Sequence, residues 1–95
     1  MQLTDDQIQE IEQMAELFFS PEDIAENIEV DPQKFILKIQ LKEGPAYKAF
    51  RKGWITSDMK LRKSIANAAY NGSSPAQGML KQLQDKTKAL IPNET

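Results

Sequence analysis

The chain has 95 residues, of which 40% are hydrophobic and 27% charged, and its formal net charge is −2. This length allows one domain, or one with a small appendage, and the composition is typical of a folded protein rather than a disordered tail. The absence of Cys excludes disulfides and thiolate chemistry, and the absence of His removes the commonest metal ligand. We therefore expect no metal and no cofactor.

No apolar run approaches the ~20 residues that span a membrane. The first residues, Met1 to Asp6, lack the basic start of a signal peptide. The sequence therefore predicts a cytoplasmic protein with no membrane partner.

Charge is strongly segregated along the chain. Ten acidic residues lie before Lys34, and all twelve Lys and Arg residues lie in 34–95 together with four acids. The first 33 residues thus carry −10 and the remainder +8. Such segregation suits a surface for a polyanion, or pairing between acidic and basic surfaces. Neutralisation of the two parts within one fold is the simpler explanation, and both stay open.

Three short helices are predicted in the first half, over 5–18, 21–28 and 32–42. Thr4 and Gln7 form a capping box, and the Ser20-Pro21 and Asp31-Pro32 pairs each supply an N-cap followed by proline at the first helical position. The stripe of the first helix ends on Phe18. Residues 37–42 alternate like a strand, but the cap at Asp31 and the lack of a second strand favour a helix.

Apolar residues at helical spacing predict one long helix over 45–70. Gly53 and residues 56–58 lower the helix propensity in its middle, so a break in the helix is allowed there. Asn71-Gly72 predicts its C-cap. Ser74 and Gln77 suggest a capping box that starts a last helix over 75–90. The predicted fold is all-α: an N-terminal trihelical helix-turn-helix unit (1–43), then a long helix and a C-terminal helix that form a hairpin for oligomerisation (44–95).

Residues 20–42 resemble the helix-turn-helix family. Ala25 is the small residue that lets the second helix cross closely, and Val30 and Phe35 belong to its apolar frame. Glu29 stands at the turn position that usually holds Gly, so it must either avoid positive φ or be strained there.

Lysines at i, i+4 and i+8 share one face of the candidate recognition helix, and glutamines lie beside them. Lys suits phosphate contacts, and Gln can pair with adenine edges. The predicted DNA-binding residues are Gln33, Lys34, Lys38, Gln40 and Lys42. A solvated helix face is the alternative explanation. Because the first two helices are acidic and repel DNA, several subunits are expected to act together.

Basic and aromatic residues interleave along the long helix. This pattern can bind nucleic acid by stacking, but the helical spacing of the aromatics favours a core or an oligomer interface. The aromatics Tyr47, Phe50 and Trp54 are therefore predicted oligomer-interface residues.

Three segments carry a more specific pattern. They are Tyr-Lys-Ala-Phe-x-Lys-Gly (47–53), Leu-Arg-x-Ser-Ile-x-x-x-Ala (61–69) and Asn-Gly-Ser-Ser-Pro-Ala-Gln-x-Met-Leu (71–80). Together they resemble the C-terminal half of phage small terminase subunits and related phage-encoded helix-turn-helix proteins. The resemblance implies a protein of the host-cell cytoplasm that recognises double-stranded phage DNA for packaging. It also implies a homo-oligomeric ring that regulates a large terminase subunit, and it adds Leu61, Ile65 and Ala68 to the predicted oligomer interface.

The sequence contains no Gly-rich phosphate loop and no convincing pair of metal-binding carboxylates, so we expect no enzyme. A helix-turn-helix transcriptional regulator, dimeric on a palindrome, is an alternative function. A protein–protein interaction module that docks through Leu37 and Leu41, which lie outside the predicted core, is another.

Overall fold

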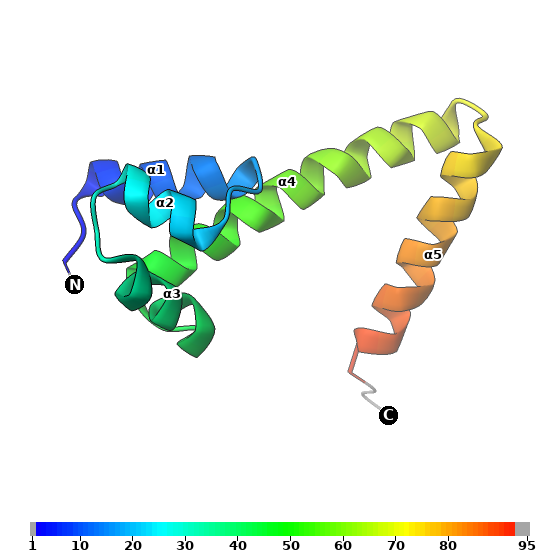
Figure 1. Cartoon of the computed structure of the whole chain (residues 1–95). Coiled ribbons are helices and arrows are strands. Elements are labelled where there is room, and N and C mark those ends of the chain that lie inside the picture. The colour runs from blue at the N-terminus through cyan, green and yellow to red at the C-terminus, as the bar shows by residue number, and fades with distance from the viewer. Residues whose placement is uncertain (1, 93–95) are drawn as a thin grey trace. The chain divides into compact units, whose positions relative to one another are not determined.

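The computed structural model describes residues 2–92, whose regular structure consists of five helices and no strand (Figure 1). They are α1 (Asp5–Glu16), α2 (Pro21–Asn27), α3 (Pro32–Leu41), α4 (Gly44–Tyr70) and α5 (Ser74–Leu90). The all-α prediction is confirmed. The strand-like alternation of 37–42 lies within α3, whose start is set by the Asp31 cap.

The first three helices begin at the predicted caps. The Thr4 hydroxyl accepts from the Gln7 N–H while the Gln7 side chain accepts from the Thr4 N–H, which completes the capping box. Ser20 and Asp31 cap α2 and α3, each followed by Pro at the first helical position.

The predicted cap of α5 is wrong by one residue. Ser73, not Ser74, has extended backbone, and its hydroxyl accepts from the Ala76 N–H at 3.3 Å. Ser74 is already helical and therefore cannot cap. With Ser73 as the cap, the third helical residue is Ala76 and no capping box forms, while the Gln77 amide nitrogen donates to the Ala69 carbonyl at 3.1 Å.

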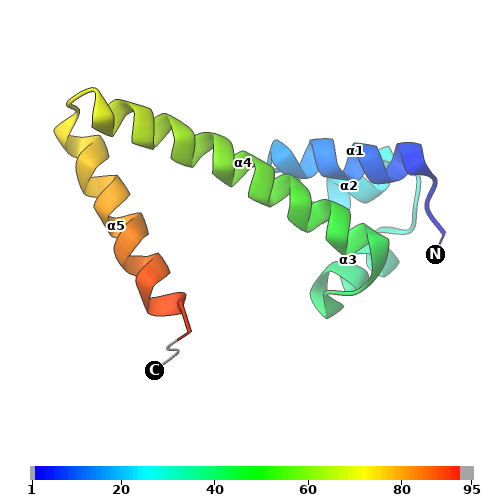
Figure 2. The ribbon, with the colours of Figure 1, turned by 180° about the vertical axis from the view of Figure 1, so that it is seen from behind.

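α4 is continuous through Gly53 and residues 56–58, where the sequence allowed a break. Gly53 is buried. Figures 1 and 2 both show the first part of α4 running beside α1, and Gly53 lies where the two helices meet. The glycine thus permits close helix packing and does not interrupt the helix.

The chain forms two compact units, Met1–Asp58 and Met59–Thr95, divided inside α4. The sequence suggested a division at 43/44. In the structure residues 44–58 group with α1–α3, because Ala46 and Ala49 are buried in the core that those helices build.

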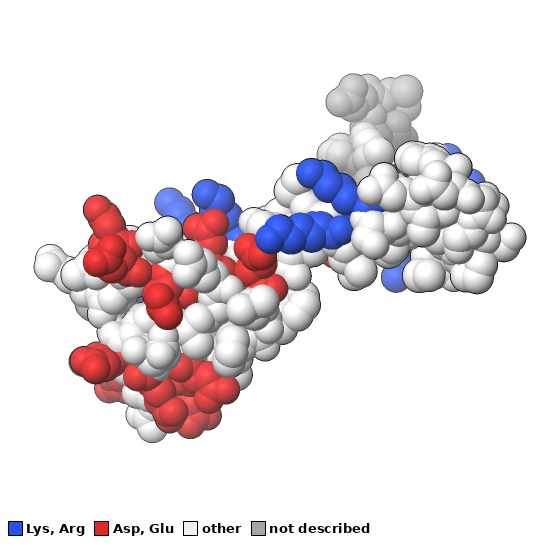
Figure 3. Space-filling model, turned by 90° about the horizontal axis from the view of Figure 1, so that it is seen from above, with Lys and Arg blue, Asp and Glu red and all other residues white. Residues whose placement is uncertain are grey.

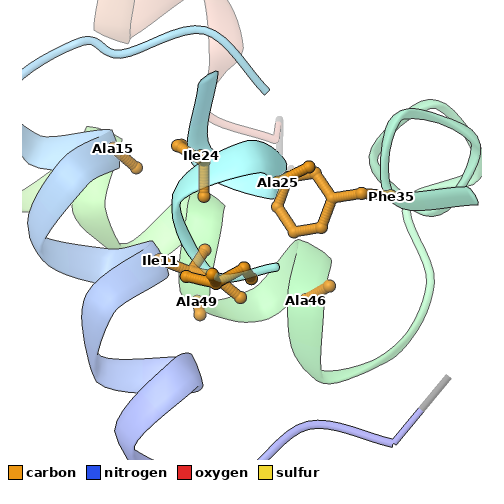
Figure 4. Packing of buried hydrophobic residues seen from close by; sticks show 8 residues of the cluster. Ile11, Ala15, Ile24, Ala25, Phe35, Ala46 and Ala49 are labelled. Atoms are coloured by element: carbon orange, nitrogen blue, oxygen red, sulfur yellow. The ribbon is translucent and has the colours of Figure 1, made fainter. Parts of the chain in front are cut away.

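The core of the first unit is small and closely packed. Its three large, fully buried side chains are Phe35, Ile11 and Ile24, and the rest of the buried cluster is mostly alanine. Figure 4 shows the Phe35 ring reaching from α3 to Ala25 on α2. Because alanine fills the space around so few large side chains, the helices approach closely.

The second unit contains the end of α4, the corner at 71–73 and α5. Gly72 has φ of 99°, and the N–H of Ser73 bonds to the Ala68 carbonyl at 3.0 Å, which confirms the predicted C-cap. Ala69 and Ala76 are buried on either side of the corner. Beyond it α5 diverges from the end of α4 (Figures 1 and 2).

Candidate nucleic-acid interface

α3 turns one apolar side to the core, and its solvent-exposed side carries lysines and glutamines together with Leu37 and Leu41. Phe35 is fully buried, and Ile36 and Ile39 are half-buried. The predicted DNA-binding residues all belong to or flank the other face. Gln33, Lys34, Gln40 and Lys42 are exposed, and Lys38 is half-buried.

The three lysines do not form one regular ridge. Lys34 and Lys38 are one turn apart within α3, whereas Lys42 is its C-cap residue, with φ of 56°. The lysine side chain at 42 is therefore displaced from the helical i, i+8 position. Among residues 2–92 no carboxylate forms an ion pair with any of the three.

In the turn between α2 and α3 the backbone takes the positive φ at Glu29 that is strained for a residue other than glycine. Glu29 has φ of 62°, in the left-handed region where Gly is usual. The N–H of Val30 bonds to the Ala25 carbonyl at 3.0 Å, and the Gln7 side chain donates to the Ile28 carbonyl at 2.9 Å. These bonds hold the turn and tie it to α1, so the strain at Glu29 is offset by its surroundings.

The unit that contains α3 is acidic. Residues 1–58 contain twelve acidic and six basic side chains, a net charge of −6. Figure 3 shows acidic side chains crowded on one face of this unit. The lysines of α3 therefore form a small basic area on an acidic body.

The predicted oligomer-interface residues all lie on α4, but they divide between the two units. Tyr47 and Phe50 are half-buried in the first unit, and Phe50 packs against its core. Trp54 is more exposed and meets Phe18 edge-to-face, with ring centroids 4.8 Å apart. The remaining three lie in the second unit: Leu61 is exposed, and Ile65 and Ala68 are half-buried.

The interleaved basic and aromatic residues of α4 do not make a free stacking platform. Phe50 packs against the core. Lys52 pairs with Glu12 of α1 at 3.8 Å, although the lysine side chain stays largely exposed. Part of this pattern is explained by packing of α4 on α1.

Sequence reasoning placed Phe18 on the buried stripe of the first helix, and this is wrong. α1 ends at Glu16, and Phe18 follows with φ of 65° and 57% of its surface exposed. The helix ends there because the N–H of Phe19 turns back to the Met14 carbonyl. The Ser20 cap was predicted, but a first helix that ran to Phe18 would leave only Phe19 for the turn before it.

Two kinds of site are not found in residues 2–92. No three Asp or Glu side chains there are placed to hold a metal ion. No helix of the same part of the chain combines the length and apolarity needed to cross a bilayer.

Comparison of the chain with protein-family models, with curated proteins and with solved structures finds no match in any of the three.

Proposed function

We propose that this is a non-enzymatic DNA-binding protein, and that α3 lies against the duplex. The observation that carries the proposal is that Lys34, which is exposed, and Lys38, which is half-buried, lie one turn apart on α3 and have no carboxylate partner among residues 2–92. Lys contacts to phosphates would position the helix, and Gln33 and Gln40 would reach base edges. The tight turn at Glu29 supports a helix-turn-helix arrangement.

Binding by one copy is weak in this proposal, because a unit of net charge −6 is repelled by phosphates. Several copies acting together overcome the repulsion, since linked weak sites add in free energy. The small-terminase resemblance supplies a matching role: a homo-oligomeric ring that recognises phage DNA for packaging in the host cytoplasm and regulates a large terminase subunit.

A transcriptional regulator uses the same α3 face but a different assembly. It would be a dimer on a palindrome, whose half-sites are about one helical turn apart. The number of subunits, measured by light scattering, separates this function from the ring.

A protein–protein interaction module is the second candidate, and one observation favours it. Leu37 and Leu41 on α3, which lie outside the predicted core, are 50% and 52% exposed. Two exposed leucines at i and i+4 can anchor a partner helix.

A salt series of duplex DNA binding tests the proposal. In the double variant Lys34→Ala/Lys38→Ala we expect weaker binding and a salt slope lower by about two, because each lost phosphate contact lowers it by ~0.9. The matched control is Lys81→Ala/Lys86→Ala on α5, which removes the same charge and should keep the slope. Unchanged binding by the α3 variant would leave the interaction module as the function, to be probed with Leu37→Gln/Leu41→Gln.

A further inference from the structure

An aromatic patch protrudes from the first unit where α1 ends beside α4. It consists of Leu17, Phe18, Phe19 and Trp54, which are 70%, 57%, 44% and 43% exposed. The Phe18 and Trp54 rings meet edge-to-face at 4.8 Å, so they form one surface. Exposed apolar groups that lie together in this way mark interaction sites.

The strained backbone conformation at Phe18 indicates that its side chain has a function outside the core of the chain. Phe18 follows α1 in the left-handed region, with φ of 65°, where glycine is the ordinary residue. A bulky side chain there costs free energy. Burial within the chain does not offset that cost, because more than half of the surface of Phe18 is exposed.

A groove between the end of α4 and α5 is the complementary feature of the second unit. Its volume is about 630 Å³, and its lining includes apolar Tyr70, Leu80, Leu83 and Ile91 with basic Arg62 and Lys88. A groove of this size is within the range that buries a ligand or an anchoring side chain. Ile91 is 62% exposed, so this apolar lining is uncovered in the single chain.

The two surfaces carry opposite charge. The first unit, which bears the patch, has a net charge of −6, whereas residues 59–95 contain six basic and two acidic side chains and carry +4. Contact between two patches, or between two grooves, would bring like charges together. Contact between a patch and a groove joins unlike charges and covers apolar surface on both sides.

We propose that the aromatic patch of one copy docks in the groove of a second copy, in a head-to-tail contact. Phe18 is the central anchor, and Lys88, which lines the groove of one copy, attracts the acidic unit of the other copy. The contact leaves each copy with one free patch or groove, so association continues beyond a dimer. The proposal deepens the self-association in the proposed function, and it needs no DNA.

Two single variants test the contact by sedimentation without DNA. Phe18→Gly removes the anchor and places the preferred residue at a left-handed position, so it should fold at least as well as the wild type. Ile91→Glu puts an acid in the groove. Each should weaken self-association by about tenfold or more, whereas Met59→Gln, at an exposed apolar residue outside both surfaces, should not.

Mixing the two variants is the decisive measurement. Phe18→Gly keeps an intact groove and Ile91→Glu keeps an intact patch, so a head-to-tail contact predicts a 1:1 heterodimer that grows no further. If circular dichroism shows that Ile91→Glu loses helix, Lys88→Glu replaces it in the mixture. Absence of the heterodimer, undiminished association of Phe18→Gly, or a wild type that stays monomeric would each overturn the contact. DNA binding by a monomer would still be possible in those cases, so the two proposals fail separately.

Discussion

Gly53 of α4 lies directly against Ala15 of α1. A β-carbon added at position 53 would stand 2.7 Å from the Ala15 Cβ and 2.9 Å from the Glu16 nitrogen. The glycine therefore sets the distance at which α4 crosses α1. This close approach at Gly53 lets the first part of α4 pack into the core of the N-terminal unit.

Replacing Gly53 with alanine should lower the free energy of unfolding by about 2–4 kcal/mol, because backbone on the facing helix cannot yield as a side chain does. Gly78→Ala on α5 is the control, since nothing lies within 4 Å of its added β-carbon. That change should instead stabilise α5 by about 0.5–1 kcal/mol. Urea denaturation of both variants measures the two effects, and equal outcomes would contradict the packing described here.

Alanine variants of two neighbouring serines can show which residue caps α5. Ser73→Ala removes the hydroxyl that accepts from the Ala76 N–H, and the loss should cost about 1 kcal/mol. Ser74→Ala should be nearly neutral because Ser74 is a helical residue. Thermal unfolding followed by circular dichroism compares them, and a larger loss at Ser74 would return the cap to the position first predicted.

Glu29 offers a route to a more stable N-terminal unit. Its φ of 62° suits glycine, so Glu29→Gly should raise the free energy of unfolding by about 0.5–1 kcal/mol. Glu29→Ala keeps the strain and loses the same charge. If both variants stabilise equally in denaturant titrations, the gain comes from charge and the backbone argument is wrong.

The acidity of α2 should limit DNA binding. Glu26 is exposed on α2, which packs on α3, so Glu26→Gln should raise DNA affinity by about twofold at low salt by weakening repulsion. The gain should shrink as salt is added. Asp85→Asn makes the same change in net charge on α5, where Asp85 pairs with Lys81, and binding isotherms should show a smaller effect for it.

Much of the secondary structure could be predicted because helix starts and stops are local. Thr4, Ser20 and Asp31 cap the first three helices through hydrogen bonds to residues two or three positions away. Gly72 likewise ends α4 with a positive φ that glycine adopts at no cost. The exposure of Gln33 and Lys34 also followed from helical spacing once Phe35 was placed inside.

By itself the sequence determined five helices, most of their boundaries and the polar face of α3, since neighbouring residues contain that information. Only the tertiary structure decided that Gly53 joins two helices, that Phe18 stands exposed beside Trp54, and that residues 44–58 belong to the first unit. These features depend on which elements, distant from one another in the sequence, come into contact in the fold. Spacing along one helix does not encode the distance to another, because that distance is set by the side chains on both.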